Sequence, residues 1–225
     1  MITRLPKWIL VGGGVLAFIA GIVNAVGFLG LYHQGITHLT GTTSLLGIAV
    51  AQQDGPAALQ LAAFIASFVA GAVLSGIIIQ DSTLKLGRRY GVALVVESLL
   101  LFAAIPLLRR GLFAGDCLAS SACGLQNAMV STFSGASLRT THLSGVFTDL
   151  GVFLGHWLRR LPVDFRRLRL WLLLIFSFGG GGTVGALLFT RFSYNTLFLP
   201  AALTGLAGIA YGIYRQDHAT AAPRS

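Results

Sequence analysis

Two histidines, His38 and His142, each begin a short polar segment in an otherwise apolar chain. Each is followed by leucine, a hydroxyl residue and glycine, in the sequences HLTG and HLSG. These segments belong to longer near-copies, residues 21–47 and 124–151, in which an Asn-Ala pair precedes the histidine. Imidazole, hydroxyl and amide side chains bind polar solutes through hydrogen bonds. A duplicated polar, helix-breaking segment in an apolar chain is typical of a transporter or channel site.

The hydroxyl residues Thr40 and Ser144 are favourable N-cap residues, so we expect a short helix to begin at each. The first turn of a helix has unpaired N–H groups and the positive end of the helix dipole. Two such ends that face each other favour an anion, or an oxygen-rich neutral solute, between them. The candidate binding residues are Asn24, His38, Thr40, Gly41, Thr42, Asn127, His142, Ser144 and Gly145.

A second interpretation of the same segments is purely structural. The glycines and hydroxyl residues could serve only close helix packing, with His38 and His142 capping nearby carbonyl groups. For a single segment this would be the better interpretation. We favour a binding site because two repeat-related segments each carry a histidine, and ionisable groups inside a membrane usually mark function.

Ionisable residues elsewhere in the apolar runs are candidates for coupling to a proton or cation. Glu97 lies in the middle of an apolar run, where a charge is costly unless it faces a cavity or a partner. It could equally be a protonated, hydrogen-bonded structural carboxyl. Asp149 follows the second polar segment, and Leu45 stands at the corresponding position of the first. Arg139 precedes the second segment, either as an interfacial basic residue or as a group that attracts an anion.

Composition places the chain among helical membrane proteins. Of the 225 residues, 55% are hydrophobic and only 10% are charged, and the mean hydropathy is +0.79. The net charge is +9, and the basic residues lie in short loops between apolar runs. This distribution fits the positive-inside rule and not a nucleic-acid surface. No protease, hydrolase or nucleotide-binding motif and no metal-ligand spacing is present. We therefore expect a bilayer environment, no nucleic-acid partner, no enzyme activity, no cofactor and no metal.

Six runs are long enough to span a membrane: residues 8–32, 56–80, 90–108, 112–133, 170–190 and 195–214. Two shorter apolar runs, residues 40–52 and 144–158, directly follow the histidine segments. If both crossed the membrane, the basic residues at 85–89 would lie opposite the arginine-rich loop 159–169. If both re-enter and return, nearly all Lys and Arg residues share one side. The positive-inside rule therefore predicts six transmembrane helices plus two re-entrant half-helices, with both termini cytoplasmic.

An odd number of spans in each half inverts the second half relative to the first. We therefore expect one all-α membrane domain built as an inverted 3+3 repeat, residues 8–110 and 111–214, with a short cytoplasmic tail, 215–225. Small residues four apart, which permit close helix approach in lipid, recur in the span that follows the short apolar run of each half. The matching residues are Ser67, Phe68, Gly71 and Ser75 in one half and Ser177, Phe178, Gly181 and Gly185 in the other.

The repeated segments also carry a family resemblance. The stretches GIVNAVGFL at residues 21–29, GLQNA at 124–128 and RTTHLSG at 139–145 resemble the bacterial YoaK-like family of unknown function (DUF1275), and the similarity covers nearly the whole chain. The resemblance implies a multi-pass protein of the bacterial inner membrane with about six spans and no established activity. It also implies two differences: family members often have an acidic residue where this chain has Asn24, and Thr-Gly-Asn where it has Thr40-Gly41-Thr42. If that acidic residue serves proton or cation coupling, this chain differs from those members in mechanism.

These observations predict a secondary transporter or channel for a small polar solute, with an anion favoured, held between two half-helix N-termini at the bilayer midplane. The competing hypothesis is a non-transporting membrane scaffold or accessory subunit whose polar segments only organise packing. A wet, polar cavity between the segments would favour the transporter, and a dry, closely packed centre would favour the scaffold. The solute, the coupling ion, the direction of transport and the oligomeric state stay open at this point.

Overall fold

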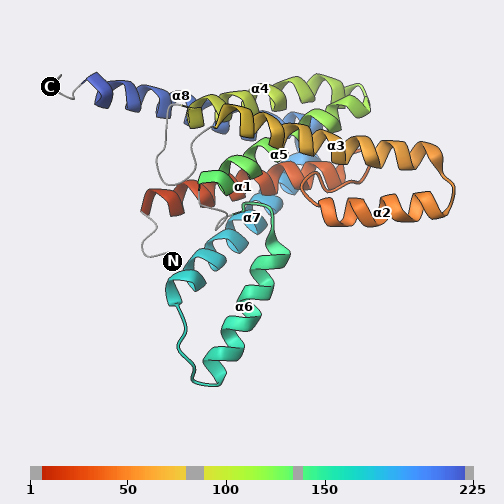
Figure 1. The fold of residues 1–225 in the computed structure, drawn as a ribbon. Coiled ribbons are helices and arrows are strands. Elements are labelled where there is room, and N and C mark those ends of the chain that lie inside the picture. The colour runs from red at the N-terminus through yellow and green to blue at the C-terminus, as the bar shows by residue number, and fades with distance from the viewer. Residues whose placement is uncertain (1–6, 80–88, 134–138, 221–225) are drawn as a thin grey trace.

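The computed structural model describes residues 7–79, 89–133 and 139–220, and the regular structure in these ranges is helical (Figure 1). The long helices are α1 (Lys7–Leu29), α3 (Gly55–Ile78), α4 (Arg89–Arg109), α5 (Phe113–Phe133), α7 (Phe165–Phe192) and α8 (Phe198–Thr220). Two shorter helices, α2 (Leu39–Ala51) and α6 (Leu143–Leu158), precede α3 and α7. A 3₁₀ turn, η1 (Ser193–Leu197), joins α7 to α8.

The helix boundaries follow the predicted apolar runs, with two differences. α7 begins at Phe165 rather than at residue 170, because the Asp164 carboxylate accepts a hydrogen bond from the Arg166 N–H and caps the helix start. α8 continues to Thr220, so most of the predicted tail 215–225 is helical. Residues 221–225 and the basic positions 85–88 lie outside the described residues.

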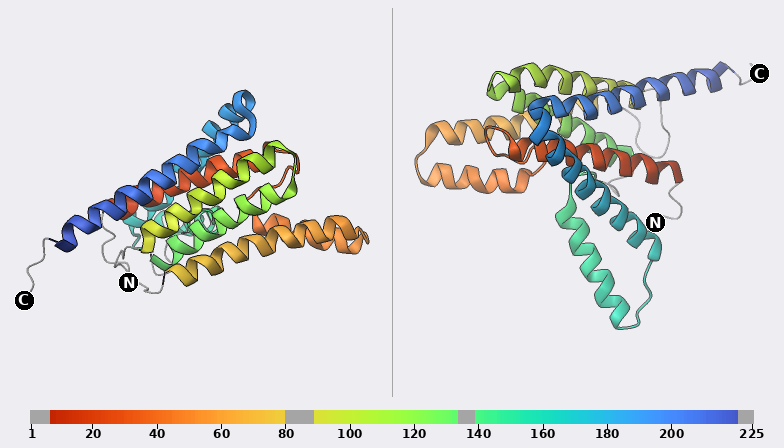
Figure 2. Two further views of the ribbon diagram at one scale, coloured as in Figure 1. Left: turned by 90° about the horizontal axis from the view of Figure 1, so that it is seen from above. Right: turned by 180° about the vertical axis from the view of Figure 1, so that it is seen from behind.

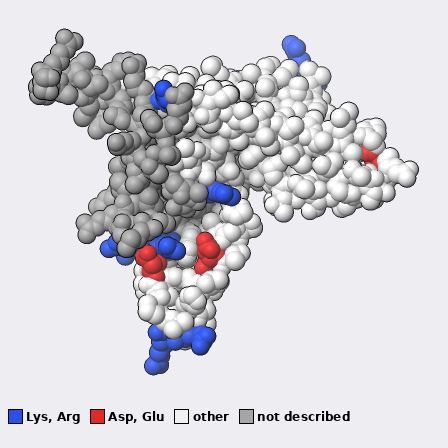
Figure 3. Space-filling view, in the orientation of Figure 1, with Lys and Arg blue, Asp and Glu red and all other residues white. Residues whose placement is uncertain are grey.

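Four segments of the described chain are long and apolar enough to cross a membrane: Leu10–Leu29, Gly55–Ile78, Arg89–Arg109 and Phe165–Ile213. The last of these contains α7, η1 and the part of α8 up to Ile213. Large apolar side chains such as Val69, Phe176 and Leu187 are exposed on the outside of the helices, as expected of a surface that faces lipid. On the face seen in Figure 3, Lys and Arg gather at the tip of the α6–α7 hairpin and most of the remaining surface is uncharged. The chain is therefore a multi-pass helical membrane protein.

The long helices pack in three pairs: α1 with α7, α3 with α5, and α4 with α8. α5 also packs against α4, which shelters its polar residues Asp116 and Gln126 from lipid. α2 folds back on α3, and α6 folds back on α7, so that two hairpins project from the bundle in different directions (Figures 1 and 2). The starts of α2 and α6 lie at the centre of the molecule (Figure 1).

Glycines set the closest helix crossings. A Cβ at Gly21 of α1 would overlap the Phe178 carbonyl oxygen of α7, and a Cβ at Gly124 of α5 would overlap the Phe68 carbonyl oxygen of α3. Such close backbone approach is available only to glycine. Four contacts of this kind form two pairs at corresponding positions of the two halves: Gly21–Phe178 with Gly124–Phe68, and Gly181–Phe18 with Gly71–Ser121.

Candidate functional site

The residues directly before each short helix lie beside the preceding long helix. The Thr37 N–H and hydroxyl both donate to Asn24 Oδ1, each at 3.0 Å. In the second half the Thr141 hydroxyl donates to Asn127 Oδ1 at 3.1 Å. Each asparagine lies more than one turn before the end of its helix. α2 and α6 therefore begin beside the bodies of α1 and α5 and not beyond their ends.

The N-cap residues of α2 and α6 are His38 and His142, so the prediction of Thr40 and Ser144 was wrong. The carbonyl of each histidine accepts the first helical hydrogen bond, from the N–H four residues later, at 3.1 and 3.3 Å. In both halves an Asn–Thr hydrogen bond holds the residue just before the histidine, through its backbone N–H as well in the first half. Neither imidazole makes a capping hydrogen bond, so no side-chain cap occupies the first-turn N–H groups.

Gly41 and Gly145 make room for the two imidazole rings. A Cβ at Gly41 would overlap the His38 ring, and a Cβ at Gly145 would lie 2.5 Å from His142 Cδ2. Each ring therefore lies over the first turn of its own helix. The glycines position the histidines beside the helix N-termini instead of contributing contacts of their own.

The two helix starts line one cavity of about 500 Å³. Its volume lies within the range of small-molecule sites. Apart from Arg139, the polar lining consists of repeat-related pairs, Asn24 with Asn127, Thr37 with Thr141, His38 with His142, and Thr40 with Ser144. The apolar lining consists of Leu39, Leu143 and four aromatic residues, Phe28, Phe68, Phe147 and Phe178. The fold thus brings six of the sequence-predicted binding residues to one place, from both halves of the chain.

The charge of this cavity is one-sided. Arg139 lines it, and no acidic side chain is found among the described residues of its wall. The side chain of Arg139 is exposed. With two helix N-termini and a guanidinium group at its wall, the cavity is electropositive and suited to an anion.

The other predicted residues do not line the central cavity. Thr42 is buried, and its hydroxyl donates to the His38 carbonyl at 3.1 Å. Gly41 and Gly145 lie under the imidazole rings. Asp149 lines two neighbouring cavities beside α6, and Glu97 is buried within α4.

These two cavities continue from the central one along α6 and α7. The first, of about 380 Å³, shares Arg139 and His142 with the central cavity. The second, of about 350 Å³, shares Asp149 and Trp171 with the first. The three cavities thus lie one after another between the centre of the molecule and the α6–α7 turn.

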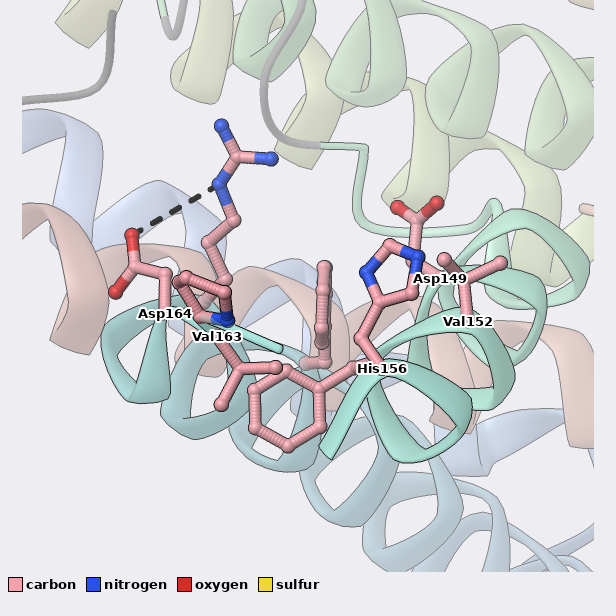
Figure 4. Close-up of a pocket in the computed structure, with 9 residues that line it drawn as sticks. Asp149, Val152, His156, Val163 and Asp164 are labelled. Carbon is pink, nitrogen blue, oxygen red and sulfur yellow. Dashed lines mark ion pairs between the residues drawn. The ribbon is translucent and has the colours of Figure 1, made fainter. Parts of the chain in front are cut away.

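Figure 4 shows the outermost of these cavities. Asp149 and His156 project into it from α6, and Val163 and Asp164 lie on the α7 side. Asp164 pairs with Arg167 at 3.9 Å, and both side chains are about half exposed, so this ion pair contributes little to stability. Among the described residues, no group of three or more His, Cys, Asp or Glu side chains could hold a metal ion.

Sequence reasoning misses several of the lining residues. Thr37 and Thr141 precede the two histidine segments, and their repetition is a signal that could have identified them. Phe68 and Phe178 belong to the matching Ser-Phe pairs, whose pattern indicates only packing. Phe68 and Phe178 serve both in helix packing and in the cavity, because their carbonyl groups lie against glycines of the partner helix while their side chains line the cavity.

Residues 13–210 match the model of one protein family, described as a protein of unknown function (DUF1275). No curated protein matches the chain, and no solved structure does.

Proposed function

The chain belongs to the DUF1275 family, whose description assigns no activity, and we propose from the geometry of the central cavity that it is a secondary transporter or channel for a small anion. The anion would bind between the N-termini of α2 and α6. His38, His142, Thr40, Ser144 and Arg139 would surround it.

The observation that carries this proposal is the pairing of two helix starts at one cavity. Each N-terminus is equivalent to roughly half a positive charge, and neither carries a capping side chain. The Arg139 guanidinium adds a full positive charge at the same wall. A small oxyanion or halide would replace the missing hydrogen-bond acceptors. A scaffold whose polar segments only organise packing has no need of this cavity.

We further propose six spans with α2 and α6 as re-entrant half-helices in an inverted repeat. At about 1.5 Å per residue the 13 residues of α2 and the 16 residues of α6 extend about 20 and 24 Å. Both lengths are short of a hydrocarbon core of roughly 30 Å. The paired crossings and the paired Asn–Thr bonds support the repeat. In a membrane, such non-helical turns persist where they line a cavity.

The access route would run along the second half of the chain. The cavities beside α6 lie one after another between the central site and the α6–α7 turn, and neighbouring cavities share lining residues. In Figure 1 the α6–α7 turn lies at the bottom and the described start of α1 at the left, and both are away from the α2–α3 and α4–α5 turns at the right. We propose that the α6–α7 turn and the start of α1 face the cytoplasm from the inner membrane, because this turn is rich in arginine.

The test uses chloride, nitrate, phosphate and acetate as probes. We expect at least one of them to raise the melting temperature of the purified protein in a concentration-dependent way and to enter reconstituted vesicles. Gly41→Leu and Gly145→Leu should abolish both effects while membrane insertion is kept, because the added side chain displaces the imidazole into the cavity. Gly47→Leu and Gly151→Leu are the matched controls in the same helices, since neither glycine has a neighbour within 4 Å. Unchanged uptake in the first pair of variants contradicts the transporter and favours the scaffold.

A further inference from the structure

Glu97 is a carboxyl group with one unsatisfied oxygen in the middle of the helix bundle. Its side chain is 2% exposed. The Gln126 amide N–H donates to Glu97 Oε1 at 2.9 Å. Glu97 Oε2 is buried and has no hydrogen-bond partner.

A hydrogen-bonded chain joins this carboxyl to the second histidine segment. Gln126 Oε1 accepts a hydrogen bond from the Thr140 hydroxyl at 3.2 Å. Gln126 is 1% exposed and Thr140 is 0% exposed, so water does not compete for this chain. The neighbours of Thr140 in the sequence, Arg139 and Thr141, both line the central cavity. The state of Glu97 can therefore be transmitted to the cavity wall through one side chain, Gln126.

The surroundings of Glu97 provide no positive charge. α4 packs against α3, α5, α8 and η1, and the described side chains of these elements include no Lys, Arg or His. Their titratable side chains are Asp116, Cys117, Cys123, Tyr194 and Tyr211. None of these side chains carries a positive charge. An ionised carboxylate with one amide donor and no counter-charge is strongly disfavoured in such a site.

We propose that Glu97 is a proton-binding site coupled to the central cavity. Oε2 takes a proton from a hydronium ion, and the carboxylate becomes a neutral acid as water is released. The closed arrangement, in which Oε2 is buried, favours this protonated form. Loss of the proton returns it to water and requires an arrangement in which water reaches Oε2. Because proton binding then differs between two arrangements, a proton gradient can drive one into the other.

The chemistry of the site favours a proton over a metal cation. The partner of the carboxyl is an N–H donor, which repels a cation, and metal ions such as Na⁺ need several converging oxygen ligands. The role of this proton site in driving transport rests on the proposed function. The proton site itself can be measured without any transported solute.

The experiment is an infrared pH titration of the purified protein in lipid vesicles, in potassium salts of large sulfonate buffers and without chloride or any of the other probe anions. The C=O stretching band of a protonated, buried carboxyl should be present at neutral pH. It should be absent from Glu97→Gln and retained in Asp116→Asn and Asp149→Asn. Thr140→Val removes the donor to Gln126 and so weakens the Gln126 hydrogen bond to Glu97. The band should then persist to higher pH than in the wild type.

The opposite results overturn the proposal. A band that survives in Glu97→Gln belongs to another carboxyl, and one that disappears when sodium replaces potassium as the buffer cation indicates a sodium site. If the band of Thr140→Val titrates at the same pH as that of the wild type, Glu97 is not coupled to the cavity through Gln126 and Thr140. Anion binding and uptake are measured separately from this band. If the anions neither bind nor enter vesicles but the Glu97 band is present, only the transport proposal fails. If the anions bind and enter but the band is absent, only the proton site fails.

Discussion

Asn24 holds the turn between α1 and α2, because its amide oxygen accepts two hydrogen bonds from Thr37. Thr37 is buried, so both donors lack water when the acceptor is removed. We expect Asn24→Leu to cost about 1–3 kcal/mol per unsatisfied donor. Thr37→Val removes only one donor and should cost about 1 kcal/mol. Unfolding in detergent measures both.

The control for this prediction is Asn24→Asp. A carboxylate oxygen accepts hydrogen bonds as an amide oxygen does, so the turn should persist. If Asn24→Asp destabilises the protein as much as Asn24→Leu, the hydrogen bonds to Thr37 are not what holds the turn.

The repeat makes several site residues recognisable from the sequence alone. Asn24 and Asn127, and likewise His38 and His142, occupy matching positions of the two repeats. Such a duplication can be seen in the sequence without knowledge of the fold. The bond between Gln126 and Glu97 joins residues 29 positions apart on two helices. Helical periodicity tells which face a residue occupies but not which neighbour it meets, so this pair required the fold.

At the scale of elements, glycine spacing determines how closely the helices cross. Gly21→Ala, Gly71→Ala and Gly181→Ala each place a methyl group against a backbone carbonyl of the partner helix. A backbone carbonyl cannot rotate away as a side chain can, so we expect each change to cost about 1–3 kcal/mol or more. The measurement is the thermal stability of each variant in detergent.

Each of these glycines has a matched control in its own helix. Gly12, Gly76 and Gly179 lie in α1, α3 and α7 and have no atom within 4 Å of an added Cβ. Alanine there should be neutral or slightly stabilising, because alanine is the better helix former. Equal losses in both sets would show that close backbone contact does not hold these crossings.

Side-chain caps fix the starts of α3 and α7, and only the start of α3 agrees with the predicted run. Asp54 caps α3 through the Ala57 N–H at 3.0 Å, and Asp164 caps α7. Gln53 and Arg160 follow the C-caps of α2 and α6 with positive φ angles of 58° and 57°. The directions in which the two hairpins project were not predictable, because they depend on contacts between α1 and α7 and between α3 and α5 that are distant in sequence.

For the whole molecule, membrane topology links the repeat to the proposed transport. An inverted repeat places two identical turns on opposite sides of the bilayer, so that the same site can be approached from either side as one half moves against the other. The paired crossings would then act as the fixed contacts about which the hairpins move. A parallel repeat would place both turns on one side and would leave the second side without a route.

Cysteine accessibility distinguishes these two arrangements. Gln52 and Arg159 are the exposed C-cap residues of α2 and α6, at corresponding positions of the two turns, and both have negative φ angles that any residue adopts. In a background lacking Cys117 and Cys123, we expect Gln52→Cys to react with a membrane-impermeant maleimide only from the outer side, and Arg159→Cys only from the inner side. Arg109→Cys at the end of α4 should behave like Gln52→Cys, because α4 ends on the same side as α2 (Figure 1). Labelling of Gln52→Cys and Arg159→Cys from one side would mean that α2 or α6 crosses the membrane completely, and the anion could not then lie between two half-helix N-termini.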